Sequence, residues 1–127
     1  NELLTNLKII GNWSSREFTI EHTMEDIYLP YGKAMALGLI VNELFINSIK
    51  HAKSNSKKLI IKISYYLNEI DEASLVYFDN GLLDNDAIQL NHQSLGFELI
   101  HALTEQLHGK IHYKVDGGLS WYIIHKI

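Results

Sequence analysis

The spacing of apolar residues along the chain predicts two long helices. Residues 33–52 follow Pro30, contain no further proline and are expected to form one helix. A second helix is expected between Ser94, a favourable N-cap residue, and Gly109, a favourable helix stop. Its apolar residues recur at helical spacing and are Leu95, Leu99, Ala102, Leu103 and Leu107.

The N-terminal part of the chain is expected to contain a helix end and two strands. Residues 3–8 indicate the tail of a helix that Gly11 ends. Apolar and polar residues alternate over 18–23, which predicts a half-buried strand. A second short strand is expected near residues 27–29.

Further alternating segments predict one sheet. Strands are expected at 59–67 and 73–78, joined by a turn at 68–72, and in a final hairpin at 111–115 and 119–123. Residues 80–93 are rich in Asn and Asp, show no clear period and are expected to form a loop. The pattern predicts an α/β two-layer sandwich, with a mixed, mostly antiparallel sheet and helices packed on one face.

Composition excludes several classes of protein. The chain has 127 residues, 46% of them hydrophobic and 20% charged, which suits one globular domain with a sizeable core. A net charge of -4, with Arg16 as its single arginine, argues against nucleic acid as the main partner. Without cysteine there is no disulfide, thiolate metal site or cysteine nucleophile. The longest apolar stretch, residues 34–41, is far shorter than the roughly 20 residues of a membrane helix.

The start of the chain bears on domain organisation. It begins at Asn1 rather than Met, and its first ten residues lack the regions of a signal peptide. We therefore expect a piece of a longer protein, with residues 1–10 as the tail of an upstream helix or linker. Residues 11–127 are expected to form the single domain.

Candidate chemistry is concentrated in the second half of the helix expected at 33–52. At 100° per residue, Glu43, Asn47, Lys50 and Ser54 fall within about 60° of arc, so a carboxylate, an amide and an ammonium share one stripe. An amide oxygen suits Mg²⁺, a lysine can neutralise phosphate, and a carboxylate can orient or deprotonate water. The alternative is the solvated stripe of an amphipathic helix with a Glu-to-Lys pair.

Two further segments could meet a ligand. Asp79, Asn80 and Gly81 end a strand, where an acid can point at a ligand edge and glycine lets the backbone approach. Residues 94–96 open a helix, whose N-terminal amides can bind phosphate. The alternatives are an ordinary Asn-Gly turn and a plain N-cap. Neither a P-loop nor a Rossmann glycine motif is present.

The ordered set of motifs is more specific than any one of them. NELFINSIKHA, then FDNG, then SLGFELIHALTEQLHGKI and a final GG hairpin resemble the ATP-binding catalytic domain of sensor histidine kinases, in the GHKL superfamily. The resemblance covers essentially the whole chain and is greatest to the short-lid type whose N-box is NELxxNSxKHA. It implies the Bergerat fold and binding of ATP with Mg²⁺.

The N-box match assigns roles to residues of the first long helix. It makes Asn47 the Mg²⁺ ligand and puts Lys50 and His51 near the phosphates. Glu43 would polarise the bound water or act as a base. The resemblance thus implies Glu43 and Lys50 as catalytic residues.

The glycine-box matches assign the adenine and the remaining phosphate contacts. Asp79 would bind the exocyclic amine of adenine, with Gly81 beside the ring, and residues 82–93 would form the ATP lid. The helix end that meets the phosphates would comprise Ser94, Leu95 and Gly96.

The resemblance implies transfer of the γ-phosphate of ATP to a histidine on an upstream phosphoacceptor and dimerisation domain, with a response regulator as the next partner. We expect a cytoplasmic domain without direct membrane contact, in a parent that could be membrane-anchored.

Two alternative functions remain. Leu83 and Leu119 replace a glycine and a threonine of the family pattern, which would suit a non-catalytic nucleotide-binding or scaffolding module. An anti-sigma-factor-type serine kinase is the other, although that type usually lacks the Lys-His end of the N-box.

Overall fold

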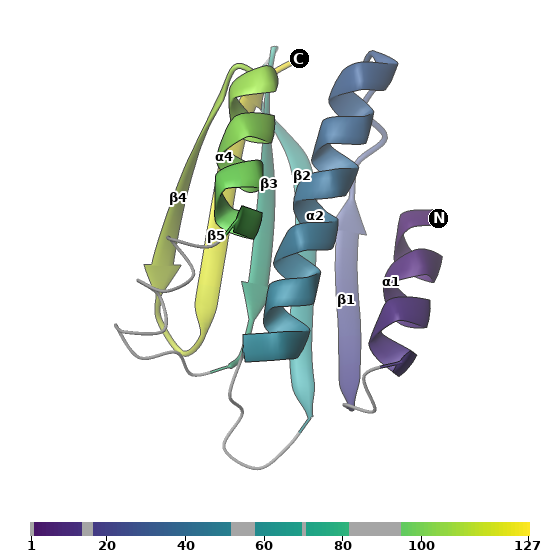
Figure 1. Cartoon of the computed structure of the whole chain (residues 1–127). Helices are drawn as coiled ribbons and strands as arrows, with labels where there is room; N and C mark the ends of the chain where they lie inside the picture. The colour runs from purple at the N-terminus through teal and green to yellow at the C-terminus, as the bar shows by residue number, and fades with distance from the viewer. Residues whose placement is uncertain (1, 14–16, 52–57, 70, 82–94) are drawn as a thin grey trace.

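The computed structural model describes residues 2–13, 17–51, 58–69, 71–81 and 95–127. It is a two-layer α/β structure in which the described helices lie on one side of a five-stranded sheet (Figure 1). The helices are α1 (Glu2–Trp13), α2 (Tyr31–His51) and α4 (Leu95–Gln106). The strands are β1 (Phe18–Met24), β2 (Leu59–Glu69), β3 (Glu72–Asp79), β4 (Gly109–Val115) and β5 (Leu119–Lys126).

The sheet has the strand order β1-β2-β3-β5-β4, with β3 in the centre. β1 pairs with β2 in parallel, starting with Phe18 opposite Leu59, and the other three pairs are antiparallel. The predicted fold class, a mixed and mostly antiparallel sheet with helices on one face, is therefore confirmed.

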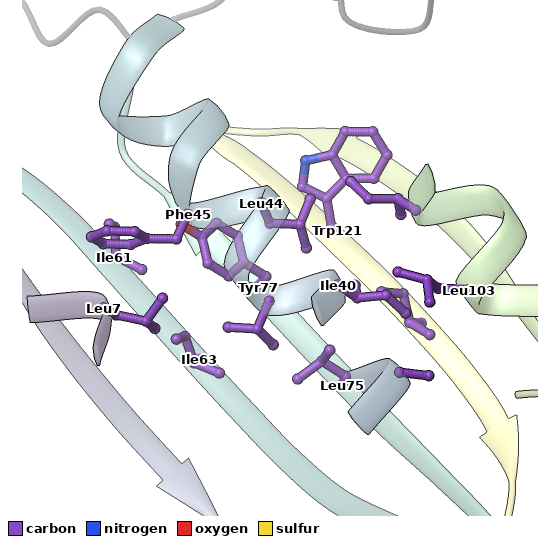
Figure 2. Close-up of a cluster of buried hydrophobic side chains, with 14 of the residues drawn as sticks. Leu7, Ile40, Leu44, Phe45, Ile61, Ile63, Leu75, Tyr77, Leu103 and Trp121 are labelled. Atoms are coloured by element: carbon purple, nitrogen blue, oxygen red, sulfur yellow. The ribbon is translucent and has the colours of Figure 1, made fainter. Parts of the chain in front are cut away.

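One hydrophobic core fills the space between the helices and the sheet (Figure 2). α2 contributes Ile40, Leu44 and Phe45, which face Tyr77 and Trp121 of the sheet, all of them buried. Burial of each such side chain contributes about 1.5–3 kcal/mol. Leu4 and Leu7 of α1 are buried in the same core, so α1 packs onto the rest of the chain.

The segment between β1 and α2 differs from the prediction. The short strand expected at residues 27–29 is wrong, because this stretch has no strand pairing and Tyr28 is 98% exposed. Ile27 and Leu29 are partly buried on either side of the exposed Tyr28, so the burial alternates as in a strand without strand pairing. α2 begins directly after Pro30, whose carbonyl oxygen accepts hydrogen bonds from the amides of Lys33 and Ala34.

Two predicted helix ends are also wrong. α1 includes Gly11 and continues to Trp13, so Gly11 does not end it. α4 ends at Gln106, and the residue in the left-handed conformation after it is His108, with φ 53°, rather than Gly109. Gly109 opens β4, where a Cβ would lie 2.7 Å from the carbonyl oxygen of Ile124.

The buried side of α4 is rotated from the one that the leucine pattern suggested. Leu99 and Ala102 are exposed, whereas Phe97, Ile100, Leu103 and Thr104 of α4 are buried, as is Leu107 directly after it. The helical period was right, and Leu103 and Leu107 of the predicted set are buried, but Phe97 and Ile100 rather than Leu99 and Ala102 complete the buried side, where α4 packs against α2 and β4. A one-dimensional pattern with apolar residues on two sides leaves this choice to the tertiary structure.

The predicted hairpin between β4 and β5 is confirmed, and its turn lies against the end of β3. The amide of Asp116 donates to the carbonyl oxygen of Gly118 at 3.0 Å, and Gly117 has φ 65°. A Cβ on Gly118 would collide with the carbonyl oxygen of Asp79 and approach the ring of Phe78 to 2.7 Å. Glycine at position 118 therefore allows the turn to pack beside Asp79.

Candidate functional site

The C-terminal half of α2, the C-terminal end of β3 and the first turn of α4 are directed toward the same end of the molecule (Figure 1). α2 runs in the helix layer above β3 and beside α4. This end carries the described residues of all three predicted motifs. Buried polar groups join the motif of α2 to the motif at the end of β3, below the surface.

Ser48 connects α2 to the end of β3. Its side chain is buried, and its Oγ lies 2.7 Å from Asp79 Oδ2, 2.9 Å from the Tyr77 hydroxyl and 3.1 Å from the carbonyl oxygen of Leu44. A hydroxyl carries one proton, and the short contact to a carboxylate is the strongest of the three. Ser48 therefore donates to Asp79, and the Tyr77 hydroxyl donates to Ser48.

Tyr77 is suited to that donor role because it stays protonated. Burial raises its pKa well above the ordinary value of 10.0, and the negative charge of Asp79 adds to the increase, while the hydrogen bond with Ser48 acts in the opposite direction. A buried neutral phenol needs a partner for its hydroxyl, and Ser48 supplies it.

Asp79 and the two residues after it form a fixed turn. The amide of Gly81 donates to Asp79 Oδ1 at 3.0 Å, so both carboxylate oxygens have donors from this chain. Asn80 Oδ1 accepts from the amide of Ile60 at 2.7 Å, and the amide of Asn80 donates to the carbonyl oxygen of Ile60 at 3.1 Å. The Asp-Asn-Gly turn is thereby attached to both α2 and β2.

The predicted stripe of α2 lies at successive turns and can be reached from outside. Glu43 and Asn47 are partly exposed and Lys50 is exposed. Consecutive members are three or four residues apart, so they are neighbours on the helix surface. A carboxylate, an amide and an ammonium in this order offer oxygen ligands for a divalent cation and a positive charge for phosphate. His51 is the last residue of α2.

The described part of the third motif begins with α4. Leu95 is the first residue of the helix, and Gly96, in the first turn, is partly buried. Phe97 fixes this turn to the sheet, with its ring centroid 5.6 Å from that of Trp121. Ser94 and the expected lid at residues 82–93 lie outside the described residues.

Ser48 was not among the predicted site residues, although the sequence contains a signal for it. It lies one turn after Leu44 and two turns after Val41, both buried, so it continues the apolar side of α2. A hydroxyl on a buried helix side requires a partner across the interface. The identity of that partner could not be read from the sequence.

Leu119 takes the place of the threonine expected beside Asp79. It lies directly opposite Asp79 in the antiparallel pairing of β3 with β5 and is buried. Its apolar side chain offers no donor, and the carboxylate receives its donors from Ser48 and Gly81 instead.

The described residues contain neither a cluster of metal-binding side chains nor a membrane-spanning helix. No three His, Asp or Glu side chains among them gather as a metal-binding group. The oxygen atoms of Glu43 and Asn47 still fit Mg²⁺ if the remaining ligands are phosphate oxygens and water. In the same part of the chain, no helix combines the length and apolar character needed to cross a lipid bilayer.

Comparison with known proteins rests on structure. No family model and no curated protein matches the sequence. The histidine kinase domain of the blue-light activated kinase from Erythrobacter litoralis EL346 matches with a TM-score of 0.83 at 18% identity, over 97% of this chain and 58% of that one. This chain has the fold of a histidine kinase catalytic domain.

Two further structures with this histidine kinase fold match this chain over nearly its whole length and nearly their own. The mycobacterial sensor histidine kinase MprB matches with a TM-score of 0.71 at 15% identity, over 98% of this chain and 91% of that one. The catalytic domain of histidine kinase ThkA matches with a TM-score of 0.70 at 14% identity, over 99% and 90%. The chain spans 58% of the length of the Erythrobacter litoralis domain.

Proposed function

We propose that this chain is the ATP-binding catalytic domain of a histidine kinase of the short-lid type. It binds ATP with Mg²⁺ and transfers the γ-phosphate to a histidine of an upstream phosphoacceptor and dimerisation domain. The observation that carries the proposal is the hydrogen bond from Ser48 to Asp79, which holds the Asp-Asn-Gly turn against the helix that bears Glu43, Asn47 and Lys50. The likeness to histidine kinase catalytic domains supports it at the level of the fold.

In this proposal Asp79 recognises adenine. An ionised carboxylate is a pure acceptor and suits the exocyclic amine of adenine, whereas guanine presents a carbonyl oxygen at that position. The donors from Ser48 and Gly81 fix the orientation of the carboxylate before the base arrives, so little ordering cost remains at binding. Gly81 has no side chain to obstruct the ring.

The α2 stripe and the start of α4 receive the phosphates. Bound Mg²⁺ would neutralise phosphate charge, the Asn47 amide oxygen would hold it, and Lys50 would add positive charge, with His51 near the phosphates. Glu43 orients water or serves as a base. Leu95 and Gly96 in the first turn of α4, with Ser94 before them in the sequence, would contribute amides where the helix dipole favours negative charge.

The transfer itself requires positioning and charge neutralisation more than covalent chemistry on this domain. The acceptor imidazole attacks the γ-phosphorus as a neutral nucleophile, the bond from that phosphorus to the β,γ-bridging oxygen breaks, and ADP leaves, so the chain needs no strong base. The partners in this proposal are the acceptor domain of the same protein and a response regulator, in the cytoplasm.

Calorimetric titration of the chain with ATP, with and without Mg²⁺, tests the proposal. We expect micromolar binding in the presence of Mg²⁺ and at least tenfold weaker binding without it. Asn47→Ala should remove the Mg²⁺ dependence and leave the circular dichroism spectrum unchanged. Asn42→Ala, on another side of the same helix, is the matched control and should bind like the unaltered chain. Absence of ATP binding in the unaltered chain would contradict the proposal.

The non-catalytic alternative rests on Leu83, which lies outside the described residues, and on Leu119. If the missing threonine hydroxyl disabled the pocket, Leu119→Thr should create ATP binding in a chain that otherwise has none. Because Ser48 already donates to Asp79, we expect ATP binding without this substitution.

A further inference from the structure

The face of the sheet that points away from the helices has an apolar centre. In β3 and β5 the residues Leu75, Tyr77, Trp121 and Ile123 face the helices, so the alternate positions point to the other side. These are Val76, Phe78, Tyr122 and Ile124, which are partly exposed, and Tyr66 beside them on β2 is 39% exposed. We call this side the outer face, and no described helix covers it (Figure 1). Contiguous apolar surface of this kind commonly marks an interaction site.

The aromatic groups of the outer face are held by contacts within the chain. The rings of His112 and Tyr122 stack with centroids 4.9 Å apart and planes at 9°. The ammonium of Lys62 lies 5.9 Å from the centroid of the Phe78 ring. Side chains that are already ordered lose little entropy when a partner covers them.

The two edges of the outer face carry opposite charges in the same register. Glu21 of β1 pairs with Lys62, which pairs with Phe78, then Ser120, and the row ends at Lys114 of β4. The salt bridge between Glu21 and Lys62 spans 3.9 Å with both side chains more than half exposed, so it is weak and leaves Glu21 available.

A second row repeats this arrangement. Glu25 follows Met24, which pairs with Tyr65, so it lies at the level of Tyr66, and that row ends at Lys110. The two glutamates and the two lysines are each four residues apart, about 13 Å along their strands. The acidic edge therefore matches the basic edge in spacing as well as in charge.

We propose that the outer face binds the outer face of a second copy of this chain, around a two-fold axis along β3. Because β3 is the central strand of five, this axis puts β1 of one copy opposite β4 of the other. Glu21 then faces Lys114 of the second copy, and Glu25 faces its Lys110. A two-fold axis perpendicular to the strands would put β4 against β4 and bring like charges together.

Val76 and Phe78 lie on the axis and meet the same residues of the second copy. Beside the axis the operation matches large side chains to small ones, because Tyr122 meets Ser64 of the second copy and Lys62 meets its Ser120, as the strand pairing dictates. Packed sheets lie about 10 Å apart with interdigitating side chains, which requires such alternation of size.

The area sets the expected strength of the dimer. Five strands about 4.8 Å apart and about 24 Å long give a face of roughly 570 Å², so two copies bury about 1,100 Å². This is at the lower end for specific complexes. We therefore expect reversible association at micromolar to submillimolar concentrations, with the α2 stripe left accessible because it lies on the helix side of the sheet.

Sedimentation velocity across this concentration range, at low and high salt, tests the proposal. Lys110→Glu with Lys114→Glu should weaken self-association at least tenfold, and so should Glu21→Lys with Glu25→Lys. An equimolar mixture of the two double variants should form a one-to-one dimer, because each edge again meets the opposite charge. Added salt should weaken the dimer by screening the edge pairs.

The control places the same charge change on the helix side. Glu98→Lys with Glu105→Lys, both exposed on α4, should self-associate like the unaltered chain. Circular dichroism checks that every variant is folded, and Lys110→Gln with Lys114→Gln replaces the reversal if it is not. A chain that stays monomeric up to about 1 mM would overturn the proposal, because association is expected below that concentration. A dimer that both charge reversals leave unchanged would also overturn it.

Discussion

Ser48 on α2 donates a 2.7 Å hydrogen bond to Asp79 at the end of β3, so a buried polar contact joins the helix layer to the sheet layer at the candidate site. The carboxylate lies opposite Leu119, which has no donor to offer. The orientation of Asp79 therefore depends on a residue 31 positions earlier in the chain.

Ser48→Ala should lower both stability and ATP affinity. It removes one donor from a buried carboxylate and the acceptor of the Tyr77 hydroxyl, at a cost of about 1–3 kcal/mol. Urea unfolding and ATP titration measure the two effects. Thr104→Val is the control, because its buried hydroxyl contacts the carbonyl oxygen of Ile100 on its own helix, and ATP affinity should not change. Unchanged ATP binding in Ser48→Ala would contradict the role given to this bond.

Asp79→Asn should reduce the preference for adenine over guanine. The neutral amide loses the charged hydrogen bond to the exocyclic amine, worth about 1.5–3 kcal/mol, so the ratio of ATP to GTP affinity should fall roughly tenfold or more. Competition titrations of both nucleotides provide the measurement. A ratio that does not change would remove Asp79 from the adenine contact.

His125 should make stability depend on pH. Its Nδ1 lies 2.8 Å from the carbonyl oxygen of Lys126, an acceptor, so Nδ1 carries the proton and Nε2 accepts from the Tyr65 hydroxyl at 2.8 Å. Burial raises the pKa of Tyr65 to about 12, which keeps this donor protonated.

Burial lowers the pKa of His125 below 6.5, the nearby charge of Lys33 lowers it further, and the bond to Lys126 partly opposes both. The folded state thus binds the proton less readily than the unfolded state. The contribution of neutral His125 to the free energy of unfolding is therefore fully present above pH 6.5. It falls by at most about 1.4 kcal/mol per pH unit as the pH decreases below that value.

His125→Gln should have a flatter profile of unfolding free energy between pH 8 and 5, measured by urea unfolding. The exposed His22→Gln should keep the original slope, and equal slopes in both variants would refute the assignment.

Gly118→Ala and Gly38→Ala should change stability in opposite directions. A Cβ at position 118 collides with the backbone of Asp79, so this variant should lose several kcal/mol and distort the turn beside the site. At position 38, within α2, a Cβ meets no atom within 4 Å and faces a cavity of about 230 Å³, so alanine should add about 0.5–1 kcal/mol. Thermal unfolding of both variants tests the pair, which fails if Gly118→Ala is as stable as the unaltered chain.

The sequence determined most of the secondary structure. The alternation in β2, β3 and the final hairpin and the proline-free stretch of α2 were sufficient, because the period of side chains is fixed by backbone geometry. The stripe of Glu43, Asn47 and Lys50 follows from the same helical spacing. The prediction failed at residues 27–29, where burial alternates without strand pairing, and at two helix ends, one of them beside the close approach of Gly109 to the carbonyl oxygen of Ile124.

The tertiary structure decided which faces meet. The period of α4 was visible in the sequence, but its buried side, with Phe97 and Ile100, depends on α2 and β4. The bond from Ser48 to Asp79 and the matching charges of β1 and β4 likewise arise only when distant segments are paired in one register. Local periodicity follows from the covalent chain, whereas partners across a core are selected by packing and by the need to satisfy buried polar groups.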